Sequence, residues 1–162
     1  MREAGRVVAE VLAELRGSVR PGVTTLDLDE MARARMAQMG ARPAFKGYRG
    51  FPAHICTSVN EQVVHGIPSR RALREGDIVG VDVGAVVEGY YGDGAATLPV
   101  GKVSPEAQEL IRVTEEALQR GIGMARPGGR LSDISHAVQQ EAESHGFSVV
   151  REFVGHGIGT QL

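Results

Sequence analysis

The sequence predicts an α/β (α+β) fold in which amphipathic helices pack against an antiparallel β-hairpin. Apolar residues near the N-terminus recur with the period of a helix, which indicates a helix with one buried face. Two apolar, glycine-rich segments flank the dipeptide Glu88-Gly89, which is typical of a two-residue hairpin loop. A helical pattern from the first 40 residues returns near residue 124. Such repetition indicates an internally duplicated fold.

The first two helices are placed by their apolar faces and their caps. We expect the first helix over residues 2–15. Its apolar face consists of Val7, Val8, Val11, Leu12 and Leu15. One of the two threonines at positions 24 and 25 is expected to cap a second helix over residues 26–39, which ends at Gly40. Residues 41–54 are rich in glycine, proline and aromatic side chains, so we expect a loop there.

The rest of the chain alternates between apolar segments typical of strands and two further helices. The expected strands are residues 54–59, 63–67, 78–87, 90–100 and 148–154. Ser104 followed by Pro105 is a typical helix start, so a third helix is expected to extend to about residue 120. A fourth helix is expected over residues 132–144 and ends at Gly146.

Residues 18–40 resemble residues 124–146, with Pro21 corresponding to Pro127 at a shift of 106 residues (127 minus 21). This similarity predicts a duplication, although two helical hairpins can share such a pattern without one.

If the duplication is real, residues 1–162 form a single domain whose first half covers about residues 1–103. The second half starts at about residue 104 and is expected to be cut off at 162. It would then lack the counterpart of the first hairpin and be incomplete.

Two aspartates within this hairpin are the strongest candidates for a functional site. With Glu88-Gly89 as a two-residue loop, Asp82 and Asp93 lie diagonally across the two strands and project from the same face. Their Cβ atoms are then expected within about 7–8 Å of each other. The small neighbours Gly84, Gly92, Gly94 and Ala95 are expected to leave room beside the carboxylates.

Two carboxylates on one apolar face repel each other unless a cation lies between them. A divalent metal ion is such a cation, and carboxylates suit hard or borderline ions. The alternative is a pair of solvated edge-strand aspartates, each near an arginine.

Histidines and the single cysteine supply further candidates. His156 lies between glycines in VGHGIG, which suits either a metal ligand in a crowded site or an ordinary loop histidine. His65 in NEQVVHGIP, between an expected strand and a proline, is by itself an unremarkable loop histidine. Cys56 is expected to be a small buried side chain rather than a nucleophile. The remaining histidines, for which we expect no functional role, are His54, His136 and His145.

Composition and charge exclude other classes of function. Hydrophobic residues make up 42% and charged residues 23% of the chain, which is ordinary for a globular protein. The net charge of −2 gives no reason to expect nucleic acid or an anionic membrane as a partner. Apolar runs are too short to span a bilayer. A single cysteine fits a reducing, cytoplasmic location.

Four stretches of the chain resemble the type I methionine aminopeptidases of bacteria. These are MREAGRVVAEVL, GYRGFPAHICTSVNEQVVHGIP, GDIVGVDVGAVVEGYYGDGAAT and FVGHGIG. The resemblance implies the pita-bread fold, which is internally duplicated. It also implies that Asp82 and Asp93 ligate metal. Asp93 would bridge two ions, Asp82 would hold one of them, and His156 would ligate the other. His65 would be the catalytic histidine that contacts the substrate near the scissile amide. Tyr48, Phe51 and Cys56 would help to bind the methionine side chain.

The activity implied by this resemblance is removal of the N-terminal methionine from nascent proteins by hydrolysis assisted by two metal ions. The ions would be Mn, Fe, Co or Zn, and the sequence does not choose among them. A monomer with the ribosome as a candidate partner is expected. Further ligands of the family lie beyond GHGIG, so this chain is expected to bind metal weakly and to show negligible turnover. The alternatives are a proline-directed peptidase of the same fold and a non-catalytic pita-bread binding domain.

Overall fold

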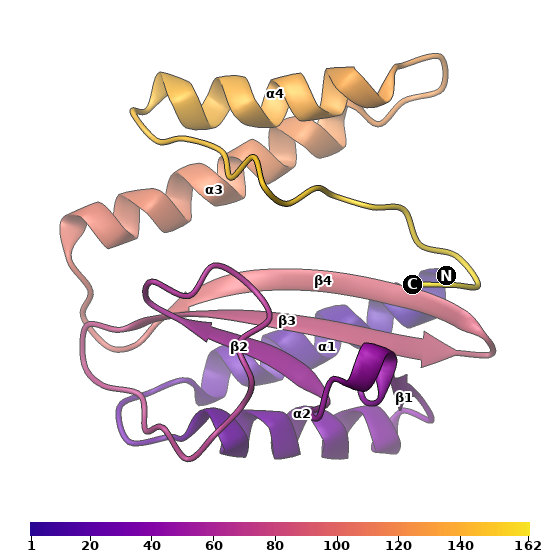
Figure 1. Cartoon of the computed structure of the whole chain (residues 1–162), viewed down its shortest axis with the longest axis vertical. Coiled ribbons are helices and arrows are strands. Elements are labelled where there is room, and N and C mark those ends of the chain that lie inside the picture. Colours follow the sequence, from indigo (N-terminus) through magenta and orange to yellow (C-terminus); the bar gives the residue numbers. More distant parts are fainter. The chain divides into compact units, whose positions relative to one another are not determined.

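A computed structural model describes residues 1–162 as two compact units (Figure 1). The first unit contains Met1–Val103 together with His156–Leu162, and the second contains Ser104–Gly155. No helix in the structure is both long and apolar enough to span a membrane.

Helices α1 (Arg2–Ser18) and α2 (Thr25–Gln38) cover one face of the sheet in the first unit (Figure 1). The helix predicted over residues 2–15 is confirmed and continues to Ser18. Helix α2 begins with a capping box, because Thr24 and Asp27 each accept a hydrogen bond from the other's backbone N–H. Gly40 follows α2 with a φ of 68°, the left-handed conformation that glycine adopts readily.

The sheet of the first unit has four antiparallel strands. They are β1 (Arg42–Pro43), β2 (Ile55–Val59), β3 (Ile78–Val87) and β4 (Tyr90–Pro99), and a short 3₁₀-helix, η1 (Tyr48–Gly50), lies between β1 and β2. Strand β3 pairs with β4 along one side and with both β1 and β2 along the other. Val87 pairs with Tyr90 across the predicted two-residue loop. Glu88 and Gly89 both have positive φ (50° and 82°), as a type I′ turn requires.

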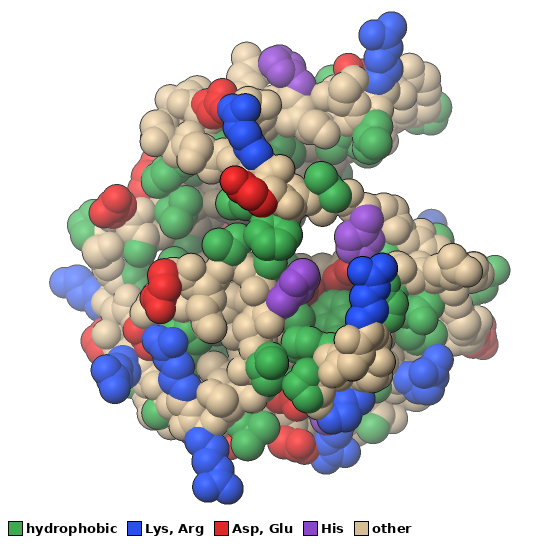
Figure 2. All heavy atoms as spheres, viewed as in Figure 1, with side chains coloured by type: hydrophobic (Ala, Val, Ile, Leu, Met, Phe, Trp, Pro, Cys, Tyr) green, Lys and Arg blue, Asp and Glu red, His purple; other side chains and the backbone are tan.

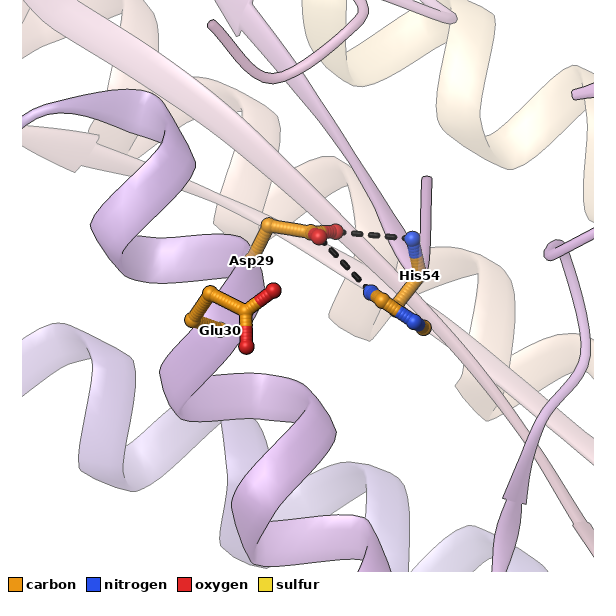
Figure 3. Close-up of side chains that lie close together, drawn as sticks. All are labelled: Asp29, Glu30 and His54. Carbon is orange, nitrogen blue, oxygen red and sulfur yellow. Dashed lines mark hydrogen bonds and ion pairs between the residues drawn. The ribbon is translucent and has the colours of Figure 1, made fainter. Parts of the chain in front are cut away.

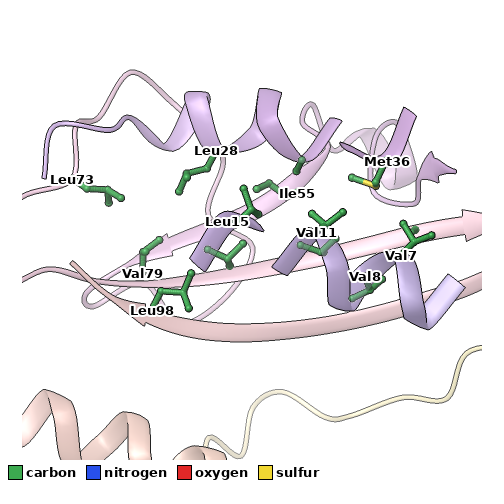
Figure 4. Close-up of a cluster of buried hydrophobic side chains, with 14 of the residues drawn as sticks. Val7, Val8, Val11, Leu15, Leu28, Met36, Ile55, Leu73, Val79 and Leu98 are labelled. Atoms are coloured by element: carbon green, nitrogen blue, oxygen red, sulfur yellow. The ribbon is translucent and has the colours of Figure 1, made fainter. Parts of the chain in front are cut away.

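The main core lies between this sheet and the two helices (Figure 4). Its side chains come from α1, α2 and the odd-numbered positions of β3, with others from β2 and β4. The fully buried ones include Val7, Val11, Leu15, Leu28, Met36, Ile55, Val79, Val81, Val83 and Leu98. Because side chains alternate across a strand, the even-numbered residues of β3 project from the opposite face, which the helices leave uncovered.

In the second unit, helices α3 (Pro105–Met124) and α4 (Leu131–Ser144) pack against each other. Ser104 caps α3 by accepting a hydrogen bond from the backbone N–H of Ala107, as the Ser-Pro pair predicted. Gly121 makes the helices' close approach possible, because a Cβ atom there would lie 2.8 Å from a methyl carbon of Val138. The predicted end of α3 near residue 120 was four residues too early.

Two of the predicted strands are wrong. Residues 63–67 form no strand, because the backbone turns at His65 (φ 59°); Gly66 is hydrogen-bonded to β2. Residues 148–154 also form no strand. All the strands of the structure lie in the first unit, so the second unit, which contains this segment, offers it no strand with which to form a ladder.

One buried hydroxyl of β2 leads to a stability prediction. Thr57 is 2% exposed on the helix-facing side, and its Oγ1 atom has no hydrogen-bond partner. We expect Thr57→Val to raise the free energy of unfolding by about 1 kcal/mol, because it removes an unsatisfied polar group while keeping the branched shape. Urea unfolding provides the measurement. The matched control is Thr25→Val, which should destabilise because Thr25 Oγ1 bonds both backbone groups of Ser69. Equal effects of the two variants would contradict the prediction.

Candidate metal centre

The hairpin places two aspartates on the sheet face that the helices do not cover. Asp82 pairs with Ala95, and Gly84 pairs with Asp93. This register is the one predicted from a two-residue loop, and it puts both carboxylates on the same face in a diagonal relation. The side chains are close enough for the charge of Asp93 and a hydrogen bond with it to raise the pKa of Asp82.

The electrostatics of this pair disfavour a negative charge on Asp82. Burial first, and then the neighbouring Asp93, raises the pKa of Asp82 to about 7. Neither carboxylate forms an ion pair with lysine or arginine, so the alternative of arginine-paired aspartates does not describe this site. The nitrogen partner that the structure provides is His156, whose Nε2 atom lies 3.7 Å from Asp93 Oδ2.

The segment that carries His156 is fastened to the outer edge of the hairpin. Tyr91 on β4 donates its backbone N–H to the carbonyl of Gly159 (2.8 Å), and the hydroxyl of Tyr48 donates to the carbonyl of Leu162 (3.4 Å). The His156 side chain remains 55% exposed. This attachment explains how a residue 63 positions after Asp93 (156 minus 93) reaches the same face of the sheet.

Beside the aspartates lies a second hydrophobic group, which we name the apolar cluster. It consists of Ala44, Phe45, Cys56 and Val86, with Phe51, Tyr91 and Leu162 packed against them. Two of the three residues expected to bind a methionine side chain, Phe51 and Cys56, belong to it. Tyr48 is attached through its hydrogen bond to Leu162. Burial and the charge of Asp82 raise the pKa of the Cys56 thiol to about 12, which fits a packed side chain and not a nucleophile.

Phe45 and Leu162 were missed by sequence reasoning. A signal for Phe45 was present, because Gly84 leaves space on the carboxylate face for a large ring from the aromatic-rich loop. A Cβ atom at Gly84 would lie 2.5 Å from that ring. Leu162 gave no local signal, since its position depends on a hydrogen bond between distant parts of the chain.

The expectation about small neighbours needs a correction. Gly92 and Gly94 do not leave room beside the carboxylates, because even-numbered positions of β4 face the helices. A Cβ atom at Gly92 would lie 2.6 Å from the carbonyl oxygen of Ala4, so this glycine lets α1 approach the sheet closely.

His65 lies at the edge of β2. The next residue, Gly66, accepts a hydrogen bond from the backbone N–H of Thr57 (2.8 Å) and donates one to the hydroxyl of Ser58 (3.1 Å). Ser58 projects from the same face as Asp82. In the first unit (Figure 2), histidine side chains are visible beside hydrophobic and acidic ones. The roles expected for His65 and for the three metal ligands remain predictions.

Comparison with known proteins identifies the family. Residues 1–162 match Metallopeptidase family M24. The chain belongs to this family. Methionine aminopeptidase 1 of Bacillus subtilis is 52% identical over 162 residues, which are 100% of this chain and 65% of that protein. The M24 chain therefore spans about two thirds of the length of the curated relatives it matches, slightly less in the case of the B. subtilis protein.

Solved structures agree with this assignment. A methionine aminopeptidase from Thermotoga maritima superposes with a TM-score of 0.97 at 47% identity, covering 99% of this chain and 65% of that one. A prolidase from Pyrococcus furiosus has a TM-score of 0.83 at 21% identity, covering 98% and 46%, and shows the fold alone. The M24 chain has the pita-bread fold, as the sequence predicted.

Membership of a metallopeptidase family implies a divalent metal ion, and the residues fit one. Two carboxylates and an imidazole suit Mn, Fe, Co or Zn. Burial and the charge of Asp93 raise the pKa of Asp82, and a nearby cation would oppose both effects. The structure does not bring the ligand atoms of Asp82, Asp93 and His156 all within 4.8 Å of one another, but it does so for two other groups, namely Asp29, Glu30 and His54, and Glu116, Glu141 and His145. The second group is already engaged in ion pairs with Arg112 and Arg120.

Proposed function

We propose that this chain binds the N-terminal methionine of a polypeptide and holds part of the metal centre of a methionine aminopeptidase. The observation that carries the proposal is the position of the carboxylate pair Asp82 and Asp93 beside the apolar cluster. The 52% identity to the Bacillus subtilis methionine aminopeptidase 1 supports the choice of substrate. A proline-directed peptidase finds support only in the shared fold.

Each group of residues at the site would have a separate role. Asp82, Asp93 and His156 would hold two divalent ions, and the chemistry these ions supply when bound is a water of lowered pKa and a polarised carbonyl. His65 would donate a hydrogen bond at the scissile amide and so orient it. The apolar cluster, with Tyr48 at its edge, would take the methionine side chain, whose thioether packs well against aromatic rings. A nascent polypeptide is the proposed substrate, with the ribosome as a candidate partner, a monomer as the proposed state and the cytoplasm as the proposed location.

Release of methionine from a Met-Ala peptide tests the function. We propose to complete the chain with the part of the Bacillus subtilis relative that the match leaves uncovered. The completed protein should release methionine in the presence of Mn²⁺, and EDTA should stop the reaction. The 162-residue chain should bind Mn²⁺ weakly and show negligible turnover, because two carboxylates and one histidine are few ligands for two ions.

A control separates substrate orientation from metal binding. In the completed protein, His65→Ala should reduce methionine release by about 100-fold or more, in line with loss of a group that assists in the transition state. Its affinity for Mn²⁺ should stay unchanged. Cleavage of Xaa-Pro peptides in preference to Met-Ala peptides would contradict the proposal and favour the proline-directed alternative.

A further inference from the structure

A buried carboxylate on α2 binds the chain at the start of β2. Asp29 is 3% exposed. Its Oδ1 atom accepts hydrogen bonds from the backbone N–H groups of His54 (2.7 Å) and Ile55 (3.0 Å). Its Oδ2 atom lies 2.7 Å from Nδ1 of the His54 ring (Figure 3). Two consecutive residues thus direct three polar groups at one side chain.

This arrangement is a hydrogen-bonded clamp and not a vacant cation site. Although ligand atoms of Asp29, Glu30 and His54 lie within 4.8 Å of one another, both oxygens of Asp29 already have partners. A buried carboxylate that accepts several hydrogen bonds is compensated without a metal ion. We therefore define the Asp29 clamp as the contacts of Asp29 with His54 and Ile55.

The clamp acts where the chain enters the apolar cluster. Phe51 lies three residues before His54, and Cys56 directly follows Ile55. Both belong to the apolar cluster, and Cys56 pairs with Asp82 in the sheet. Residues 51–54, between η1 and β2, have no regular secondary structure, so no ladder holds the backbone there, and Ile55 is the first residue of the β2 ladder. Fixing the backbone at His54 and Ile55 therefore fixes two members of the cluster from outside it.

We propose that Asp29 is a positioning residue that shapes the apolar cluster through the backbone of His54 and Ile55. Asp29 forms no hydrogen bond with the cluster or with the two hairpin aspartates. The consequence for methionine recognition rests on the proposed function. The consequence for the packing of Cys56 does not, and Cys56 is the single thiol of the chain.

The test uses the 162-residue chain and compares four variants. Asp29→Leu keeps the size of the side chain but removes every acceptor. Asp29→Asn keeps one oxygen for the two backbone N–H groups, and its amide can donate to the neutral His54 ring. His54→Leu removes one of the three contacts and provides a milder probe if Asp29→Leu fails to fold. Leu98→Ala is the control, because it weakens the main core from β4, which β3 separates from β2.

The first readout is the rate at which iodoacetamide alkylates Cys56. The rates of the variants are compared under conditions in which all of them have the same free energy of unfolding. A thiol that reacts only after local opening reports the stability of its surroundings. We expect Asp29→Leu to increase the rate about tenfold or more and His54→Leu about threefold, since hydrogen bonds to charged groups are strong. Asp29→Asn should stay within about twofold of the unmodified chain because the backbone contacts persist.

The second readout is the set of NMR shift changes that L-methionine causes in the apolar cluster. Asp29→Leu should weaken methionine binding, and Leu98→Ala should not. If Asp29→Leu and Leu98→Ala expose Cys56 equally, Asp29 has only a general structural role and the proposal is wrong. A second outcome separates the two proposals. If the unmodified chain shows no methionine-induced shifts while Asp29→Leu still exposes Cys56 selectively, Asp29 positions the apolar cluster but the proposed function is wrong.

Discussion

Replacing Asp93 with asparagine is expected to lower the affinity of the chain for Mn²⁺ by about 100-fold or more. Mutating a residue that only hydrogen-bonds a metal ligand typically lowers metal affinity roughly 10- to 100-fold. Mutating the ligand itself should lower the affinity at least as much. Asp93 occupies the centre of the site, since it lies 3.7 Å from His156 and contributes to the raised pKa of Asp82. Asp82→Asn should have a similar effect. In the completed protein, either variant should release no detectable methionine.

Paramagnetic line broadening by Mn²⁺ in NMR spectra measures weak binding to the 162-residue chain and identifies the residues nearest the ion. The matched control is Glu88→Gln, which removes one negative charge from the turn of the same hairpin without touching the site. It should retain the affinity of the unmodified chain. Methionine release at an unchanged rate by the completed Asp93→Asn variant would overturn the ligand assignment, and so would broadening centred away from the two aspartates.

The geometry of the hairpin was predictable because a turn fixes the parity of the residues that follow it. Once Glu88 and Gly89 form the loop, every facing pair along the two strands is determined, including the positions of Asp82 and Asp93. The helices were predictable for an equally local reason. Helix α2 starts with the capping pair Thr24 and Asp27, and α3 starts with Ser104 and Pro105. In each pair the two residues lie within four positions of each other in the sequence.

Features that depend on distant parts of the chain were not predictable in this way. Residues 63–67 are as apolar as a strand, but a strand needs a neighbour in register, and no local pattern reports that. Asp29 and His54 are 25 residues apart, and His54 was expected to be an ordinary loop histidine. Their pairing becomes visible only when α2 packs beside β2. Leu162 reaches the apolar cluster through the backbone of β4, which side-chain patterns do not encode.

Without metal, the free energy of unfolding is expected to fall as the pH rises from about 4 to about 7. The pKa of Asp82 is raised to about 7 in the folded chain and returns to its ordinary value of 3.8 on unfolding. Between these values the folded state holds a proton that the unfolded state has released, so stability decreases with pH. The contribution is fully present below pH 4 and lost above pH 7. Each pKa unit corresponds to about 1.4 kcal/mol, which sets an upper limit of about 4 kcal/mol.

Urea unfolding in EDTA at pH 5 and pH 8 measures this effect as the difference between the unmodified chain and Asp82→Asn. Taking the difference removes the contributions of titrating groups that both proteins share, including the histidines. Asp82→Asn should lose less stability between the two pH values, and equal losses would show that Asp82 ionises normally. Adding Mn²⁺ at pH 8 should restore stability to the unmodified chain but not to the variant, because metal ligands must be deprotonated. A bound cation is then expected to offset the burial and the charge repulsion that weaken the metal-free fold at neutral pH.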